Sequence, residues 1–166
     1  MGRFDDYIAD LLLNADIQRL ARRGAHHFSI NRLEHSLAAA KLSYVVARFI
    51  NADARVCARA GMLHDWFFEN RDEHQNRAGA NIHHYKISAA NARGIGESEA
   101  VIRAIETHMW LYVRGKPRSK EAWIIWMADN VVWLTDGAWS FARYCKKKAR
   151  HFIYGHSTHQ HEPYAF

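Results

Sequence analysis

Residues of the types that bind metal ions, histidines and aspartates, lie at several points along this chain, and two of them, His64 and Asp65, are adjacent. Imidazole nitrogens and carboxylate oxygens are ligands that iron, manganese, nickel, cobalt and zinc accept in proteins. The two cysteines, Cys57 and Cys145, are far apart and lack metal-ligand spacing, so thiolates are absent from this set. The sequence therefore predicts a metal centre, with His35, His64, Asp65, His108 and Asp129 as candidate ligands.

Several of these polar residues fall on the apolar faces of predicted helices. At helical spacing His35 shares a stripe with Ala39 and Val46, and His108 lies on the apolar face of its own segment. A single inward histidine is most often a hydrogen-bonded core residue, but several of them on different helices favour a site. A buried carboxylate without a partner costs several kcal/mol, so Asp129 is expected to have a cation nearby.

The elements that must position these residues are helices, because apolar residues repeat at helical spacing and strand-like alternation is nearly absent. Asn31 is expected to cap one helix, with Glu34 in the capping-box position, and Asp53 and Ser98 are expected to cap two others. A polar, aperiodic stretch over 69–83 and the segment 114–117 indicate loops. The predicted helices span about 4–22, 31–50, 53–68, 85–93, 98–112 and 119–147.

Length and composition point to one all-α domain, a bundle of about six helices over residues 1–166, with a loosely ordered His-rich tail from about residue 152. No apolar run reaches the ~18 residues of a membrane span, and the N-terminus does not resemble a signal peptide. Two free thiols suit a reducing cytoplasm, which is the expected location.

The net charge is +6, and the basic run at 143–150 is interpreted as a solvated helix end. Neither a membrane nor a nucleic acid is expected as a partner.

With His84 included, the order of His35, His64-Asp65, His84, His108 and Asp129, H…HD…H…H…D, resembles that of the HD-domain superfamily, the helical metal-dependent phosphohydrolases. The resemblance implies that all six residues are metal ligands. The lone dipeptide His-Asp is weak evidence, whereas the full order is much stronger, and the resemblance covers residues 32–130. The segments that carry it are 32–37 (RLEHSL), 63–65 (LHD), 84–92 (HYKISAANA), 105–111 (IETHMWL) and 121–130 (EAWIIWMADN).

The resemblance also implies a role for each ligand, because the two additional histidines mark the subset of the superfamily with a binuclear centre. In that subset the aspartate of the HD pair bridges two divalent ions, here expected to be iron or manganese, with nickel, cobalt and zinc as alternatives. A hydroxide between the ions would be the nucleophile. The first ion would be held by His35, His64, Asp65 and Asp129. The second would be held by Asp65, His84 and His108.

Two points stay open on the resemblance. His83 is adjacent to His84 and is an alternative ligand, although the family pattern favours His84. Many members also carry a Lys or Arg about four residues after the HD pair, where this chain runs from Trp66 to Glu69. Lys86 is the preferred catalytic contact to phosphate, since it follows His84 by two residues. The candidates for this contact are Arg71, Arg77, Lys86, Arg114, Lys116 and Arg118.

The function expected from the resemblance is hydrolysis of a phosphoester or phosphoanhydride of a nucleotide or dinucleotide, a small phosphorylated substrate. The same fold and ligand order occur in mixed-valent diiron oxygenases of the inositol and phosphonate type, and ligand order does not separate the two chemistries. Hydrolases are the more numerous, which favours hydrolysis. A non-catalytic ligand sensor of the same fold is a third hypothesis, although a pure binder has no need of all six ligands. The oligomeric state, a homodimer included, is left open.

Overall fold

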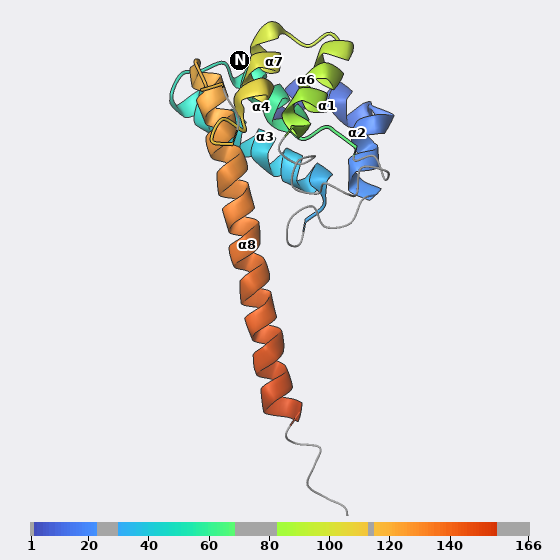
Figure 1. The fold of residues 1–166 in the computed structure, drawn as a ribbon, viewed down its shortest axis with the longest axis vertical. Helices are drawn as coiled ribbons and strands as arrows, with labels where there is room; N and C mark the ends of the chain where they lie inside the picture. The colour runs from blue at the N-terminus through green and yellow to red at the C-terminus, as the bar shows by residue number, and fades with distance from the viewer. Residues whose placement is uncertain (1, 23–29, 69–82, 113–114, 156–166) are drawn as a thin grey trace, which may run out of the picture.

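A computed structural model describes residues 2–22, 30–68, 83–112 and 115–155 of the chain. In these residues every regular element is a helix, which confirms the all-α class. Figure 1 shows a body of short helices from which the last helix, α8, runs out as a long rod. The elements are α1 (Phe4–Leu13), α2 (Ala15–Arg19), a 3-10 turn (Leu20–Arg22), α3 (Arg32–Phe49), α4 (Ala54–Leu63), α6 (His84–Gly94), α7 (Glu99–Thr107) and α8 (Lys120–Gly155).

The predicted helix caps are confirmed. The Asn31 side chain accepts from the backbone N–H of Glu34 at 2.9 Å, and the Glu34 carboxylate accepts from the Asn31 N–H at 2.9 Å, which completes the capping box of α3. Asp53 caps α4 by accepting from two backbone N–H groups, and Ser98 caps α7 by accepting from the N–H of Val101. Each side chain satisfies donors that a helix start leaves without an intrahelical partner.

The predicted single helix over 4–22 is wrong, because the helix is interrupted at Asn14. The backbone of Asn14 is extended, and its side chain accepts from the N–H groups of Asp16 and Ile17, so it ends α1 and caps α2. Apolar periodicity continues across the break, with Ile8 and Ile17 both buried. Apolar periodicity alone therefore does not reveal that the Asn14 side chain caps a new helix.

Two helices end earlier than the sequence predicts, and both end at a predicted ligand. The helix expected over 53–68 ends at Leu63, so His64 is its C-terminal cap residue. The helix expected over 98–112 ends at Thr107, so His108 holds the same position on α7. A helix C-terminus carries partial negative charge and carbonyls with no intrahelical partner. The carboxyl ends of α4 and α7 therefore favour positive charge where the two histidines lie.

The core is built around α4, which contacts α1, α3, α6, α7 and α8. Every residue of α4 except Arg55 is buried. Its Met62 and Leu63 belong to the same buried apolar cluster as Ile105 of α7 and Ile125 of α8. The described part of the chain contains no helix that is both long enough and apolar enough to cross a membrane. The last helix continues through Gly155, past the start of the predicted tail, and residues 156–166 lie outside the described part.

Gly61 sets the distance between α3 and α4, and replacing it with alanine is expected to destabilise the protein. A Cβ there would lie 2.6 Å from the Cα of Ala40 and 2.9 Å from its backbone nitrogen, so the two helices would have to separate. Overpacking of this kind costs about 1–3 kcal/mol. Thermal or urea unfolding of Gly61→Ala measures the loss.

Gly94→Ala is the matched control for this substitution. Gly94 is exposed in the last turn of α6, and a Cβ there meets nothing within 4 Å. Alanine at such a position is neutral or stabilising, since it lowers the entropy of the unfolded chain. Equal unfolding free energies for the two variants would contradict a close α3–α4 contact at Gly61.

Candidate metal centre

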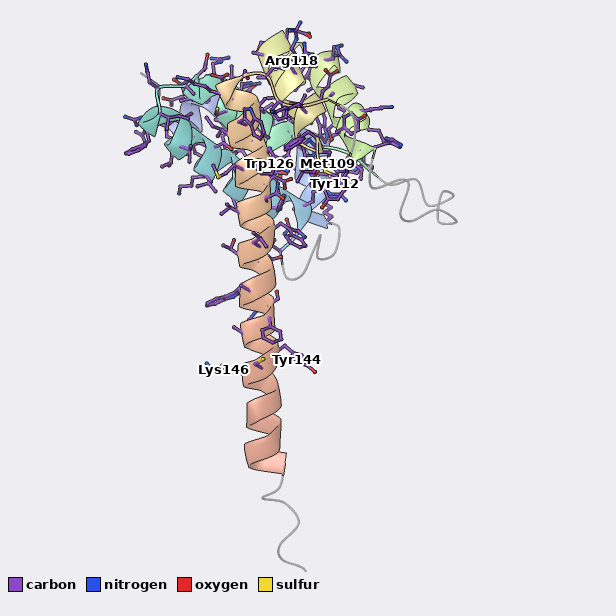
Figure 2. All side chains as sticks on the ribbon, turned by 60° about the vertical axis from the view of Figure 1, so that its left-hand side comes forward. Met109, Tyr112, Arg118, Trp126, Tyr144 and Lys146 are labelled. Atoms are coloured by element: carbon purple, nitrogen blue, oxygen red, sulfur yellow. The ribbon has the colours of Figure 1, made fainter. Side chains whose placement is uncertain are left out.

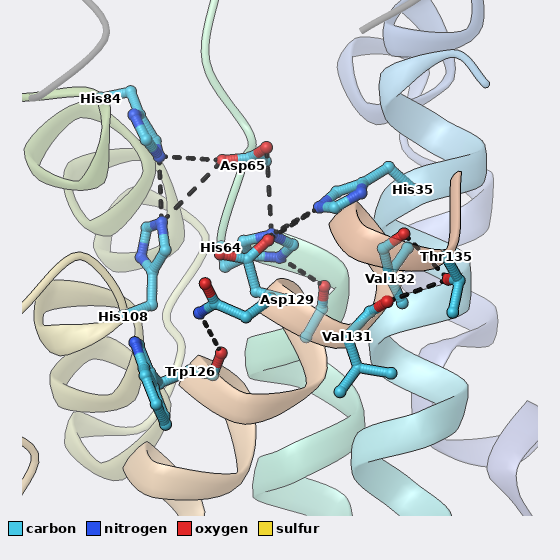
Figure 3. Close-up of polar contacts among 12 residues, drawn as sticks. His35, His64, Asp65, His84, His108, Trp126, Asp129, Val131, Val132 and Thr135 are labelled. Atoms are coloured by element: carbon cyan, nitrogen blue, oxygen red, sulfur yellow. Dashed lines mark hydrogen bonds and ion pairs between the residues drawn. The ribbon is translucent and has the colours of Figure 1, made fainter. Parts of the chain in front are cut away.

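The six residues predicted as ligands lie together in the interior, although they come from five helices and a turn. His35 comes from α3, His64 and Asp65 from the end of α4 and the turn after it, and the others from the start of α6, the end of α7 and the middle of α8. Figure 3 shows their side chains converging. The side chains of His35 and His64 are 0% exposed, and that of Asp129 is 18% exposed. Buried polar groups at this density require mutual partners or ions.

The first of two groups in this cluster consists of His35, His64 and Asp129. The Nε2 atom of His35 lies 3.0 Å from Asp129 Oδ1 and 3.3 Å from His64 Nε2, and His64 Nε2 lies 3.4 Å from Asp129 Oδ1. Three atoms at these separations lie on a circle of about 1.9 Å radius, so one ion at about 2.1 Å from each fits just outside their plane. Two imidazoles and one carboxylate form a donor set that suits a divalent transition metal.

The second group consists of Asp65, His84 and His108. His84 Nε2 lies 2.9 Å from His108 Nε2 and 3.0 Å from Asp65 Oδ1, and His108 Nε2 lies 4.0 Å from the same oxygen. These atoms lie on a circle of about 2.0 Å radius, which again matches the about 2.0–2.2 Å of metal–nitrogen and metal–oxygen bonds. Both groups therefore fit an ion with little rearrangement.

Asp65 lies between the two groups, as Figure 3 shows. Its Oδ1 atom faces His84 and His108, and its Oδ2 atom lies 3.9 Å from His64 Nε2 in the first group. The side chain is 6% exposed, so water does not compete freely for either oxygen. A carboxylate that presents one oxygen to each of two sites has the geometry needed to bridge two ions.

Backbone carbonyls orient two of the histidines. His64 Nδ1 lies 2.8 Å from the carbonyl oxygen of Gly61, and His108 Nδ1 lies 2.7 Å from that of Ile105. A carbonyl oxygen only accepts, so each Nδ1–H donates and Nε2 is left as the nitrogen that can bind an ion. Such contacts to the second ring nitrogen are typical of metal-binding histidines. The acceptors are carbonyls in the last turns of α4 and α7, which explains why the ligands follow helix ends.

The electrostatics of the cluster call for a cation. Burial lowers the pKa of His64, but the charge of Asp65 and the contact with Asp129 outweigh it and raise that pKa to about 9. Burial opposes the charge of Asp129 as well, yet contacts with His35 and His64 hold the pKa of that carboxyl well below its usual range. Burial lowers the pKa of His108 to about 4, assisted by the charge of His64. A metal ion at the first group would displace the His64 proton and supply the same positive charge.

Of the two adjacent histidines left open by the sequence, His84 lies in the cluster. It is buried as the first residue of α6, whereas His83 precedes the helix with an exposed side chain. Lys86, the preferred phosphate contact, is exposed, and its ammonium lies 5.9 Å from the centroid of the Tyr85 ring. Lys116 and Arg118 are also exposed. The remaining candidates, Arg71, Arg77 and Arg114, lie outside the described residues.

Sequence reasoning missed a stack that supports the second group. The ring of Phe67 lies parallel to the His84 imidazole, with centroids 4.8 Å apart and planes at 24°. The guanidinium of Arg32 lies 3.8 Å from the centroid of the same phenyl ring, and it donates to the Phe67 carbonyl at 2.8 Å. Arg32 is 35 residues away in the sequence and buried, so only the tertiary structure reveals this role.

The sequence matches the model of a known domain family. The family model that matches is the HD domain, and it matches residues 32–134, from the first residue of α3 to the middle of α8. The matched segment contains all six residues of the cluster. No solved structure matches the chain.

The curated relatives that match the chain are Ribonuclease Y proteins of several bacteria, at modest identity. Ribonuclease Y of Thermoanaerobacter pseudethanolicus is 34% identical over 108 residues, which cover 65% of this chain and 20% of that protein. Ribonuclease Y of Sulfurovum sp. is 32% identical over 122 residues, covering 74% of this chain and 22% of that protein. Ribonuclease Y of Opitutus terrae is 28% identical over 128 residues. The chain therefore spans about a fifth of the length of these relatives.

Proposed function

The chain belongs to the HD-domain family, and from that premise we propose that it is a metal-dependent phosphohydrolase with a binuclear centre. The observation that carries the proposal is the division of the six candidate ligands into two largely buried groups with Asp65 between them. A structural role needs no second group of this kind. The reaction is proposed to take place in the cytoplasm, in keeping with two free cysteines.

Each residue of the cluster is proposed to have a defined role in binding the ions or the substrate. His35, His64 and Asp129 would hold one ion, His84 and His108 the other, and Asp65 would bridge both. Two divalent ions, when bound, supply Lewis acidity and make a hydroxide nucleophile available between them near neutral pH. The Gly61 and Ile105 carbonyls hold two imidazoles in the metal-binding tautomer. Arg32 and Phe67 fix the plane of the His84 ring. Lys86 is proposed to contact the substrate phosphate.

The substrate is proposed to be a small phosphorylated molecule, with a nucleotide or dinucleotide as its class. Two exposed lysines support an anionic substrate, Lys86 two residues after His84 and Lys116 near Trp123. The names of the relatives favour a second candidate, a phosphodiester of RNA. Both candidates need the same attack by hydroxide on a phosphorus atom. They differ in the group that leaves and in the protein surface that must bind the rest of the substrate.

Oxygenation and ligand sensing are the two rivals. An oxygenase draws electrons from iron, so a redox-inert metal abolishes its turnover, whereas hydrolysis needs only Lewis acidity. A sensor retains ligand binding and gives no product with any metal. These requirements make the identity of the metal and the presence of dioxygen the decisive variables.

The manganese-loaded protein is expected to release inorganic phosphate or a nucleoside monophosphate from at least one member of a panel, at equal rates under nitrogen and in air. The panel comprises nucleoside mono-, di- and triphosphates, dinucleoside polyphosphates and a short RNA. Phosphate release and chromatography of the products measure the reaction. His64→Ala protein treated with the same manganese solution controls for contaminating phosphatases.

Three other outcomes would overturn part of the proposal. Turnover confined to the RNA would replace the nucleotide class with the second candidate. A protein that is inactive under nitrogen but, with iron, consumes oxygen in the presence of a polyol or phosphonate would establish an oxygenase. Binding of panel members without product under any condition would establish a sensor.

A further inference from the structure

The last helix extends far beyond the body that it helps to build (Figure 1). Its first half packs into the core through buried residues such as Ile125, Ala128 and Val132. Beyond Asp136 the described side chains, those of residues 137–146, include none that is buried. The helix nevertheless continues to Gly155, a further 19 residues or about 28 Å at 1.5 Å per residue.

One face of this extension carries aligned apolar residues, here called the α8 stripe. It consists of Val131, Leu134, Ala138, Phe141 and Cys145, which are spaced alternately by three and four residues, as in the a and d positions of a coiled coil. Leu134 is 58% exposed and Phe141 is 68% exposed. Single exposed apolar residues need no explanation, but a continuous row of them marks an interaction surface.

The surface of the extension away from the stripe carries basic residues and two tryptophans, Trp133 and Trp139, which are 42% and 65% exposed. At 100° per residue Arg143 lies about 160° from the centre of the stripe, and Trp133 and Trp139 lie about 120° from it on either side. Tyr144 and Lys146 flank the stripe, and Figure 2 shows them projecting to opposite sides of the helix. Helices of this kind owe most of their stability to the packing of an apolar face. The extension therefore requires a partner for its stripe.

We propose that this partner is a second copy of the chain, packed antiparallel along the α8 stripe. A twofold axis at Ala138 sets Leu134 of one copy beside Phe141 of the other, and Val131 beside Cys145. The small residue at the centre lets the two helices approach, and the larger residues on either side fill the space between them. The proposal is independent of the reaction that the metal centre catalyses.

Charge selects the antiparallel arrangement. Residues 143–150 read RYCKKKAR, and a parallel pair would bring two such runs side by side. Like charges at that distance repel, whereas an antiparallel pair separates the two runs and aligns the helix dipoles favourably. The body does not obstruct the stripe, since Val131 and Leu134 are exposed although they lie beside the packed half of α8.

The available area is sufficient for a dimer. With Tyr144 at its edge, the stripe offers on the order of 500 Å² of apolar surface per copy, since a whole aromatic side chain presents about 150–250 Å². Two copies then bury about 1,000 Å², which is the lower bound for a specific interface. We therefore expect a dimer of moderate affinity.

Light scattering after gel filtration of the full chain tests the proposal. The wild-type protein is expected to have the mass of two chains, and the double variant Leu134→Glu, Phe141→Glu half that mass. Trp139→Glu is the matched control, because Trp139 is 65% exposed on the other face of the same helix, and it should remain a dimer. A wild-type monomer, or dissociation by Trp139→Glu alone, would overturn the proposal.

Thiol cross-linking tests the orientation without weakening the interface. Val131→Cys is expected to form a disulfide with Cys145 of the second copy under mild oxidation, while wild-type protein and the double variant Val131→Cys, Cys145→Ser should not. Cys57 is buried and does not interfere. A wild-type dimer linked through its two Cys145 residues would be parallel and would overturn the arrangement. A monomer that floats with phosphatidylserine-containing vesicles would replace the second copy with a membrane surface.

Discussion

Replacing Asp65 with alanine is expected to remove both metal ions at once and to lower kcat/KM by at least about a thousandfold. The carboxylate presents one oxygen to each half of the centre, so its loss leaves His84 and His108 without an anionic partner and removes a neighbouring negative charge from the first group. Metal ions contribute several kcal/mol to transition-state stabilisation, and about 1.4 kcal/mol corresponds to each tenfold change in rate. Elemental analysis after manganese loading gives the stoichiometry, and the panel assay gives the rate.

Two further variants make this test specific. Glu106→Gln is the matched control, because Glu106 is also a carboxylate near the end of α7 but pairs with Arg93 at the surface. It is expected to keep both ions and full activity. If Asp65→Ala does not fold, Asp65→Asn keeps the shape of the side chain and removes its charge. A folded Asp65 variant with unchanged metal content would show that the bridge is wrongly assigned.

Replacing His108 with alanine is expected to reduce the metal content from two ions per chain to one. His108 contributes only to the second group, where its Nε2 atom lies 2.9 Å from that of His84. The first group keeps His35, His64 and Asp129 and should keep its ion. Activity should fall by about a hundredfold or more, because one ion cannot stabilise both the attacking and the leaving oxygen.

The reciprocal substitution completes the argument. His35→Ala removes a ligand of the first group and should leave the second ion in place. Manganese titration followed by elemental analysis separates the two variants, since each should retain one ion. Loss of both ions in both variants would show that the two groups do not bind independently. Retention of two ions by His108→Ala would remove His108 from the site.

Much of the local structure follows from the sequence alone. The capping box of Asn31 and Glu34 and the caps at Asp53 and Ser98 were predicted because each cap is made by side chains within three residues of a helix start. The all-α class followed from apolar periodicity in the same way. The interruption of the helix at Asn14 was not predicted, although it is also local. The spacing of apolar residues is the same on both sides of Asn14, so it does not show that a cap lies between them.

The six candidate ligands were also predicted from the sequence, by their types and by the resemblance of their order to that of a known family. Their division into two groups was inferred there only through the resemblance to a family. In the structure the division depends on where α4 and α7 end, because the last-turn carbonyls of these helices turn the His64 and His108 rings. The choice between His83 and His84 depends on a single residue of phase, about 100°, at the start of α6, which sequence periodicity does not resolve.

The sequence by itself determined the helical class, the caps and the candidate ligands, since each depends on neighbours along the chain or on residue type. Only the tertiary structure decided which ligands meet, how Arg32 and Phe67 support His84, and that α8 leaves the body with an apolar stripe exposed. These features depend on contacts between residues 17 to 94 positions apart, such as Phe67 with His84 and His35 with Asp129. Helix packing sets such contacts, and no local pattern encodes them.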